Sequence, residues 1–366
     1  MKVPFVDLSR EFKILRKDLI KTFDEVGKSG QYIRGERLEK FENKISKIIG
    51  CKYVLGVSNW TEGALMIFKS LSIGKNDEVI TVSHSFVATC GAIIAAQAKP
   101  VFVDINEDLL MDVNLIEKAI TKKTKAIMPV HLSGIPCQMD KINTIAKKYN
   151  LYVIEDAAQA FGSKYNKKMV GNLGHIGCFS MHPLKNLGVY GDGGFVTTNN
   201  KKIYEKIKLL RHHGLKTRNE ARIWGYNGKL DELQAAFANI KLTHIKKWKK
   251  KHQDIARFYN SKLSINILKP DKKYIENTFF HNYIIRVKDR SNLIKFLKNN
   301  NVETAIHYPI PIHRQEAYTK MFKQKKKLKI TEKISKEILS LPIYHALKKR
   351  ELEKVVNTIN KYYSKK

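Results

Sequence analysis

The fold is decided by two neighbouring stretches of the chain, Ile154-Glu-Asp-Ala-Ala-Gln-Ala-Phe-Gly162 and Cys178-Phe-Ser-Met-His-Pro-Leu-Lys-Asn-Leu-Gly188. Each begins at the end of a hydrophobic segment and continues into polar sequence with glycine or proline, which predicts a buried strand followed by a loop. Asp156 ends the first strand, and Lys185 follows the second. Because parallel sheets bind ligands beyond the carboxyl ends of their strands, we expect both side chains at one edge of a sheet.

The first 200 residues alternate short segments rich in Val and Ile with helical patterns. This alternation predicts an α/β fold with a mostly parallel central sheet that is covered by helices on both faces. The expected strands are Tyr53–Val57, Glu78–Val82, Pro100–Ile105, Ala126–His131 and Leu151–Ile154, with helices from about Thr61, from about Phe86 and after Asp140. The stretch from Gly177 to Thr198 predicts two further strands around a glycine-rich turn. The turn does not match a dinucleotide-binding site, because the strand, turn and helix order of such a site is missing.

A long helical pattern extends from Asp231 towards Tyr259 and predicts a helix that connects two domains. Beyond it the pattern restarts as a smaller α+β unit. Its expected elements are a strand over Phe280–Val287, a helix over Ser291–Asn299, a strand over Thr304–Tyr308 and a helix over Arg350–Tyr362. We therefore predict a large domain of residues 1–245 and a small C-terminal domain of residues 246–366.

The amino-acid composition limits the kinds of protein that this chain can be. The chain has 366 residues, 43% of them hydrophobic, so it can bury a large core. Its 68 Lys and Arg against 34 Asp and Glu give a net charge of +34, which raises the possibility of nucleic acid or membrane binding. The basic clusters Lys246–His252 and Lys323–Lys329 lack interleaved aromatics apart from Trp248, which argues against base stacking.

Neither a transmembrane segment nor a signal peptide is expected, since no run of about eighteen apolar residues exists and the N-terminus alternates charged and apolar residues. We therefore predict a cytoplasmic protein without membrane insertion. The four cysteines are far apart and show no CxxC spacing, and the twelve histidines show no HExxH pattern. Neither a metal site nor a disulfide framework is predicted.

The residues at the sheet edge suit pyridoxal phosphate. A loop lysine such as Lys185 forms an imine with the cofactor aldehyde and moves protons, and a carboxylate such as Asp156 pairs with the pyridine nitrogen. Ser180 offers a hydroxyl to the phosphate, and the turn around Trp60 and Thr61 opens a helix whose N–H groups suit the same anion. Phe86 follows a second strand, where its ring can stack on a pyridine or simply pack in the core.

Together, the motifs identify a resemblance. They are Val3-Pro-Phe-Val-Asp-Leu, Gly30-Gln-Tyr-Ile-Arg-Gly, Val101-Phe-Val-Asp-Ile, Pro129-Val-His-Leu-Ser-Gly, Glu155-Asp-Ala-Ala-Gln, the Cys178–Gly188 stretch, Gly225-Tyr-Asn, Leu230-Asp-Glu-Leu-Gln-Ala-Ala and His307-Tyr-Pro-Ile-Pro. Over nearly its whole length the chain resembles the DegT/DnrJ/EryC1/StrS family of sugar aminotransferases. The resemblance implies a fold-type I, pyridoxal phosphate-dependent homodimer with a shared active site.

By motif match, the resemblance gives Lys185 as the lysine that binds the cofactor, Asp156 as the partner of its ring nitrogen, Gln159 as a ring contact and Ser180 as a phosphate ligand. Asn227 matches the asparagine that reaches the phosphate from the neighbouring subunit. His307 and Tyr308 either contact substrate or only close the small domain against the large one, and His182 either supports the lysine loop or merely packs.

Two departures from the family pattern concern the substrate. Trp60 stands where the family commonly has glycine beside the phosphate, so its side chain either lines the substrate pocket or leaves only its N–H to the anion. Gly228 and Lys229 replace the usual Ser-Arg after Asn227. These changes favour an unusual substrate over lost activity. Relatives that became dehydratases carry histidine in place of Lys185, which argues against that branch.

The reaction that the resemblance implies is transfer of an amino group from glutamate to a keto sugar. We expect a nucleotide-linked 3-keto or 4-keto sugar that is destined for a surface polysaccharide such as lipopolysaccharide. The alternative acceptor is a free keto sugar acid such as an 8-oxo-3-deoxy-octulosonate, because the His-Pro-Leu-Lys-Asn variant resembles enzymes of that kind. A non-catalytic basic protein that binds nucleic acid, or a regulatory protein that has lost catalysis, is a weaker alternative because Lys185 is retained.

Overall fold

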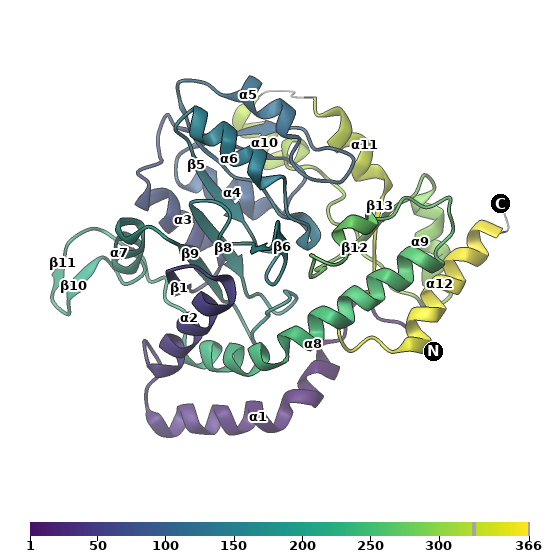
Figure 1. Ribbon diagram of the computed structural model, residues 1–366, viewed down its shortest axis with the longest axis horizontal. Helices are drawn as coiled ribbons and strands as arrows, with labels where there is room; N and C mark the ends of the chain where they lie inside the picture. The colour runs from purple at the N-terminus through teal and green to yellow at the C-terminus, as the bar shows by residue number, and fades with distance from the viewer. Residues whose placement is uncertain (324–326, 365–366) are drawn as a thin grey trace.

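The central element is a seven-stranded sheet in the order β1-β9-β8-β5-β4-β2-β3, seen in a computed structural model that describes residues 1–323 and 327–364 (Figure 1). Within this sheet β9 runs antiparallel to both neighbours and the remaining pairs are parallel. The strands are β1 (Tyr53–Val57), β2 (Glu78–Val82), β3 (Lys99–Val103), β4 (Thr124–Ile127), β5 (Tyr152–Asp156), β8 (Ile176–Ser180) and β9 (Gly194–Thr198). The prediction of a mostly parallel α/β sheet is confirmed.

Helices cover both faces of the sheet because successive strand residues point to opposite sides. Cys178 and Val196 pack towards α3, α4 and α7, whereas Phe179 and Phe195 pack towards α2 and α8. The α-helices of the described residues are α1 (Leu8–Ser29), α2 (Glu36–Ile49), α3 (Trp60–Ser70), α4 (Val87–Ala95), α5 (Ile116–Ala119), α6 (Met139–Lys148), α7 (Lys201–Leu210), α8 (Glu232–Lys262), α9 (Arg290–Asn299), α10 (Glu316–Phe322), α11 (Lys329–Glu337) and α12 (Lys349–Ser364).

Short elements connect these layers. Two-stranded sheets are formed by β6 (Lys164–Tyr165) with β7 (Lys168–Met169), by β10 (Leu215–Thr217) with β11 (Glu220–Ala221), and by β12 (Tyr283–Arg286) with β13 (Ile338–Leu341). Single 3₁₀ turns are η1 (Val113–Leu115), η2 (Leu132–Gly134), η3 (Lys272–Tyr274) and η4 (Ile312–Arg314). η2 lies beside the strand end that carries Asp156, because the N–H of its N-cap residue His131 donates to the Asp156 carbonyl at 3.1 Å.

The C-terminal part lies at the far end of α8, which runs from beneath the sheet to α9 and α12 (Figure 1). The predicted boundary at residues 245 and 246 falls inside α8. One hydrophobic core continues across it, because Ile80 and Ile127 of the sheet belong to the same buried cluster as Tyr283 and Leu341. The division into two domains therefore stays a prediction, and the two parts are joined by a continuous apolar core.

The prediction of a strand over Thr304–Tyr308 is wrong. Within this segment Ala305 alone makes an isolated bridge, to Ser340 of β13. β13 pairs with β12 along one edge over four residue pairs, and along its other edge it meets this segment only at Ala305. The segment therefore leaves the small sheet, and His307 is held by a 2.9 Å hydrogen bond between its Nδ1 and Ser340 Oγ.

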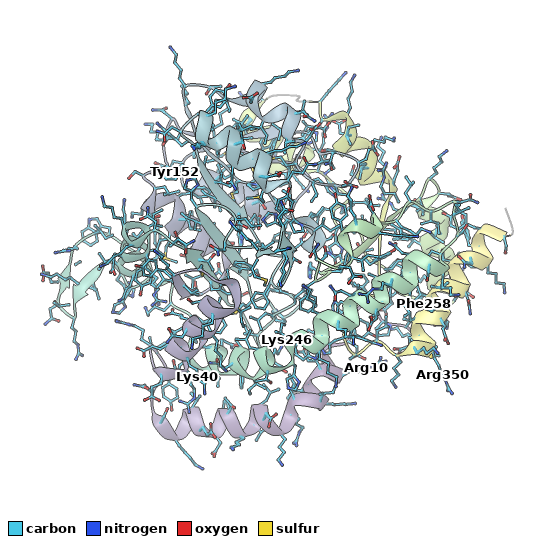
Figure 2. The ribbon with its side chains drawn as sticks, in the orientation of Figure 1. Arg10, Lys40, Tyr152, Lys246, Phe258 and Arg350 are labelled. Atoms are coloured by element: carbon cyan, nitrogen blue, oxygen red, sulfur yellow. The ribbon has the colours of Figure 1, made fainter. Side chains whose placement is uncertain are left out.

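The N-terminal helix is tied to the last helix by an ion pair. Arg10 Nη2 lies 2.7 Å from Glu351 Oε1, and the Glu351 side chain is only 2% exposed. Figure 2 shows Arg10 close to Arg350 at the start of α12. The N-terminus thus lies beside the start of α12 in the C-terminal part (Figure 1).

The aromatic ring of the basic cluster Lys246–His252 on α8 is not available at the surface. Trp248 is buried and stacks on His345 with ring centroids 4.0 Å apart. His252 Nδ1 lies 2.7 Å from the Phe280 carbonyl, and Lys249 Nζ donates to the Gly162 carbonyl at 2.8 Å. Lys246 remains on the outside of α8 (Figure 2). The second cluster includes Gln324 to Lys326, which lie outside the described residues. Because Trp248 is in the core, the α8 cluster offers no ring for base stacking.

Candidate active site

A cavity of about 600 Å3 lies at the carboxyl edge of the sheet, where β2, β5 and β8 end. Nine of the ten residues predicted for the site line it: Trp60, Thr61, Phe86, Asp156, Gln159, Ser180, Lys185, His307 and Tyr308. They come from positions as far apart as 60 and 308, so the fold brings together what the sequence separates. The tenth residue, Asn227, does not line this cavity.

Asp156 sits at the end of β5 in an almost closed environment. Its backbone N–H donates to the Pro129 carbonyl at 2.9 Å, which fixes the strand end. Thr89 Oγ1 donates to Oδ2 at 2.8 Å and Ala158 N donates to Oδ1 at 3.2 Å. Burial nevertheless raises the pKa of the Asp156 carboxyl above its ordinary value. A positively charged ring nitrogen in the cavity would supply the opposite charge that this carboxylate lacks.

Lys185 follows β8 in a turn that closes when its N–H donates to the His182 carbonyl at 2.8 Å. Burial lowers the pKa of the Lys185 amine to about 8, and the charge of Asp156 opposes this shift in part. A substantial fraction of the amine is therefore neutral near physiological pH. A neutral amine is the form that attacks an aldehyde.

The start of α3 forms an anion-binding corner. Asn59 caps the helix, with its Oδ1 accepting from Glu62 N at 2.9 Å, so the first N–H groups of α3 are directed towards the cavity edge. Gly194 allows β9 to approach this corner, because a Cβ there would lie 2.9 Å from the Asn59 carbonyl carbon. Ser180 adds a hydroxyl, to which His182 N donates at 3.2 Å. A phosphate group fits these donors.

A second hydrogen-bonded group lies across the cavity. Ser133 N donates to Gln159 Oε1 at 2.7 Å, and Gln159 Nε2 donates to the Tyr308 hydroxyl at 3.1 Å. The Tyr308 ring is 5.9 Å from the ring of Phe86. Phe86 is 54% exposed, so it is not a core residue and its ring is free to contact a ligand.

Some lining residues were not found from the sequence. Thr89 contacts Asp156 directly and is bonded to Ser85 at 2.7 Å. Ser85 precedes α4 and Thr89 lies in its first turn, so two hydroxyl residues at a helix start that follows a strand end are a usable signal for the ligand side of the sheet. His281 and Asn282 give no comparable signal, since they lie far along the chain. Burial lowers the pKa of His281 well below its ordinary value and that of His307 to about 4, so both imidazoles are neutral.

Asn227 lies apart from these residues. Its side chain is exposed, and its Oδ1 accepts from Lys229 Nζ at 2.5 Å. A residue that serves the site of a neighbouring subunit would be exposed in a single chain, so this position agrees with the role that its motif implies.

Comparison with known proteins identifies the family of this chain. The model of the DegT/DnrJ/EryC1/StrS aminotransferase family matches residues 13–360. The chain belongs to this family. It is 41% identical to the dTDP-3-amino-3,6-dideoxy-alpha-D-galactopyranose transaminase of Aneurinibacillus thermoaerophilus, over 98% of this chain and 99% of that protein. It is 39% identical to the pleiotropic regulatory protein of Geobacillus stearothermophilus, over 99% of both chains.

Solved structures of the family agree with the fold. DesV of S. venezuelae, solved with a ketimine intermediate, superposes with a TM-score of 0.96 at 33% identity, over 99% of this chain and 98% of that one. NtdA of Bacillus subtilis, solved with its cofactor PMP, superposes with a TM-score of 0.93 at 31% identity, over 99% of this chain and 85% of that one. The family depends on pyridoxal phosphate, and the prediction of a sugar aminotransferase family member with this cofactor is confirmed.

The cofactor fits the residues that are present. Asp156 is a buried carboxylate that has no positively charged partner at hydrogen-bond distance among the described residues, Lys185 is a partly neutral amine, and the α3 corner is an anion site on the same cavity. The buried donor Trp60 Nε1 also has no hydrogen-bond partner among these residues. Within residues 1–323 and 327–364, no helix is long and apolar enough to cross a membrane.

Proposed function

We propose that this protein transfers an amino group from glutamate to a nucleotide-linked 3-keto or 4-keto sugar, and that it works as a homodimer. The observation that carries the proposal is the common cavity of Lys185, Asp156 and the α3 corner. The relative from Aneurinibacillus is named for a dTDP-linked amino sugar, which supports a sugar nucleotide as substrate. The product would serve the synthesis of a surface polysaccharide such as lipopolysaccharide.

Each residue has a proposed task at a stated atom. When bound, pyridoxal phosphate supplies an aldehyde for the amine and a ring that holds an electron pair. Lys185 Nζ would hold the cofactor and, once released, would move the α-proton of the amino donor to the cofactor within the same half of the reaction. With the keto sugar it would move a proton in the reverse sense. The Asp156 carboxylate keeps a proton on the ring nitrogen. Ser180 and the N–H groups of Trp60 and Thr61 hold the phosphate.

Other residues shape the cavity around this chemistry. Gln159 is held from both sides by Ser133 and Tyr308, so its amide is fixed at the cavity wall, where it would contact the cofactor ring. Phe86 would stack on that ring, and His307 with Tyr308 would bound the sugar from the C-terminal part. The four cysteines are free and buried, which supports the cytoplasm as the proposed compartment.

The experiment that tests the lysine uses absorbance. Purified protein with cofactor is expected to absorb in the near-ultraviolet to visible range, and Lys185→Ala is expected to lose the band of the covalently held cofactor. Lys167→Ala, which removes an exposed lysine of the β6–β7 turn, is the control and should keep the band. A band that persists unchanged in Lys185→Ala would refute the assignment.

A second experiment identifies the acceptor. The protein is loaded with pyridoxamine phosphate and offered dTDP- and UDP-linked 3-keto and 4-keto sugars and a free keto sugar acid, and the return of the aldehyde band is followed. We expect the band to return with a nucleotide-linked keto sugar. Return only with the free acid would reject the nucleotide-linked substrate while leaving the aminotransferase intact.

A further inference from the structure

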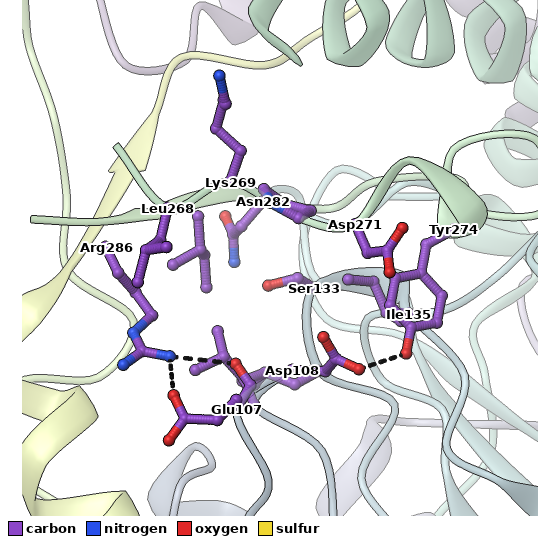
Figure 3. Close-up of a pocket in the computed structure, with 14 residues that line it drawn as sticks. Glu107, Asp108, Ser133, Ile135, Leu268, Lys269, Asp271, Tyr274, Asn282 and Arg286 are labelled. Atoms are coloured by element: carbon purple, nitrogen blue, oxygen red, sulfur yellow. Dashed lines mark hydrogen bonds and ion pairs between the residues drawn. The ribbon is translucent and has the colours of Figure 1, made fainter. Parts of the chain in front are cut away.

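A second cavity of about 240 Å3 adjoins the candidate active site and is drawn in Figure 3. Its walls are the turn Glu107–Leu109 and the segment Leu132–Ile135 on the sheet side, and residues 268–274 with β12 on the C-terminal side. Asn282 is the one residue that lines both this cavity and the larger one. We call it the rear cavity.

The charged side chains around the rear cavity already have partners. Arg286 lies 2.5 Å from Glu107 and 2.8 Å from Glu337. Asp108 accepts from the Tyr274 hydroxyl at 2.7 Å, and Figure 3 shows this bond on the cavity wall. Lys269 Nζ donates to the Leu263 carbonyl at 3.0 Å and points away from the cavity (Figure 3).

Asp271 completes this set, because its carboxylate accepts from Lys273 N at 2.9 Å and lies 3.0 Å from Lys273 Nζ. The three carboxylates and the guanidinium on the wall thus have partners within the described chain, and the Lys269 amine is directed away from the cavity. A charged ligand would enter without a counter-ion, which is costly in a buried site. The cavity therefore favours a neutral molecule.

Two neutral polar groups remain unsatisfied. Ser133 Oγ and Asn282 Nδ2 are buried and have no hydrogen-bond partner among the described residues. Each residue is only 3% exposed. Figure 3 shows the Ser133 hydroxyl and the Asn282 amide directed towards the interior of the cavity. Buried polar groups of this kind are normally satisfied, so a ligand that bonds to both would stabilise the site.

We propose that the rear cavity binds a neutral polyhydroxylated molecule of about the size of one hexose. Hydroxyl groups both donate and accept, as the Asn282 donor and the Ser133 hydroxyl require. The apolar side chains of Ile135 and Ile284 match the C–H face of a sugar ring. The volume corresponds to about eight waters at roughly 30 Å3 each, which is space for one ring with its substituents.

The rear cavity and the larger cavity are linked through the contacts of Ser133. Ser133 bears the hydroxyl that a ligand would meet, and its own N–H holds Gln159 Oε1 at 2.7 Å. Ser133 has a left-handed backbone with φ of 59°, so its position depends on its surroundings. Occupancy of the rear cavity therefore acts on the residue that orients Gln159.

The test measures binding of D-glucose to the cofactor-loaded protein by calorimetry, with D-glucuronate as a charged probe of the same ring. D-Glucose is expected to bind and D-glucuronate to bind at least about tenfold more weakly, because its charge finds no partner. No detectable D-glucose binding at millimolar concentration, or equal binding of the anion, would overturn the proposal.

Variants separate the two cavities. Ser133→Gly removes the hydroxyl at a backbone conformation that glycine tolerates and is expected to weaken D-glucose binding about fivefold. Leu268→Trp narrows the cavity from a position that is 60% exposed, so it should fold normally and also weaken binding. Lys269→Met, on the same wall but pointing away, should leave binding unchanged.

Phe86→Ala is the control in the larger cavity. Binding that is lost in Phe86→Ala and retained in both Ser133→Gly and Leu268→Trp would place D-glucose in the larger cavity and overturn the proposal. This outcome would leave the proposed transamination untouched, because the acceptor screen measures return of the cofactor band and does not depend on the rear cavity.

Discussion

Thr89 Oγ1 donates a 2.8 Å hydrogen bond to Oδ2 of Asp156, and both side chains are almost completely buried. The bond stabilises the carboxylate against the burial that raises its pKa. Thr89→Val keeps the shape and removes the donor. We expect its affinity for pyridoxal phosphate to fall about fivefold, as for loss of one buried hydrogen bond.

The measurement for this variant is a titration of cofactor-free protein with pyridoxal phosphate, followed by absorbance. Thr89→Ser keeps a hydroxyl at the same atom and serves as the matched control, with affinity near that of the wild type. Equal affinities for wild type and Thr89→Val would show that the hydroxyl does not support the Asp156 carboxylate.

The second prediction concerns pH. The pKa of Lys185 is about 8 because the amine is buried, and the neutral form is the nucleophile. The rate at which cofactor-free protein captures pyridoxal phosphate should rise as the pH passes through about 8 and then level off. Stopped-flow absorbance between pH 6 and about 10 measures this profile directly.

Asp156→Asn tests the cause of that profile. The negative charge of Asp156 raises the pKa of Lys185 and so opposes the effect of burial. Removing it should lower the pKa further and move the midpoint of the rate profile to lower pH. A midpoint that moves to higher pH would contradict the electrostatic link between the two residues.

Much of the fold could be predicted from the hydrophobic pattern of the sequence. The strands that end at Asp156 and Ser180 are each buried at four of their five residues, and their ends predict a common sheet edge correctly. The prediction of a strand over Thr304–Tyr308 is wrong because its apolar content suits a strand, whereas only Ala305 pairs with the second edge of β13. Strand pairing depends on which partner is available, and a local pattern does not contain that information.

The candidate site could be predicted only in part from the sequence, for a related reason. Lys185 and Asp156 are close in sequence and carry a family motif, whereas Ser133 and Asn282 reach the rear cavity from separate segments. The missing partners of their polar atoms are a property of tertiary packing. No spacing along the chain shows that a buried hydroxyl or amide is left without a hydrogen bond.

The third prediction concerns Trp60, which replaces a small residue at the start of α3. Its side chain is 6% exposed and belongs to the buried cluster with Ala64 and Met66. Trp60→Ala should lower the free energy of unfolding by about 3–5 kcal/mol, as for other large buried aromatics. Trp224→Ala removes an indole that is 84% exposed and should change the stability little. Urea unfolding of cofactor-free protein compares them, and equal midpoints would mean that the Trp60 ring does not support the core.

The last prediction tests the shared active site. Asn227 is exposed and lies outside the cavity of its own chain, as a residue that serves a neighbouring subunit must. Asn227→Ala should weaken cofactor binding about tenfold or more, because hydrogen bonds to a charged phosphate are among the stronger ones. Gel filtration should show a dimer for this variant as for the wild type.

Mixing of the two variants Lys185→Ala and Asn227→Ala then distinguishes a shared site from a local role, when activity is assayed at a cofactor concentration too low to load Asn227→Ala alone. In a dimer of one Lys185→Ala chain and one Asn227→Ala chain, one site loses both residues and the other has both intact. If Asn227 acts across the interface, unfolding and refolding the two variants together should restore about a quarter of the wild-type sites, since about half of the dimers are mixed. If Asn227 acted within its own chain, every site would lack one residue and no activity would return. Restoration therefore requires that Asn227 of one subunit completes the site that contains Lys185 of the other.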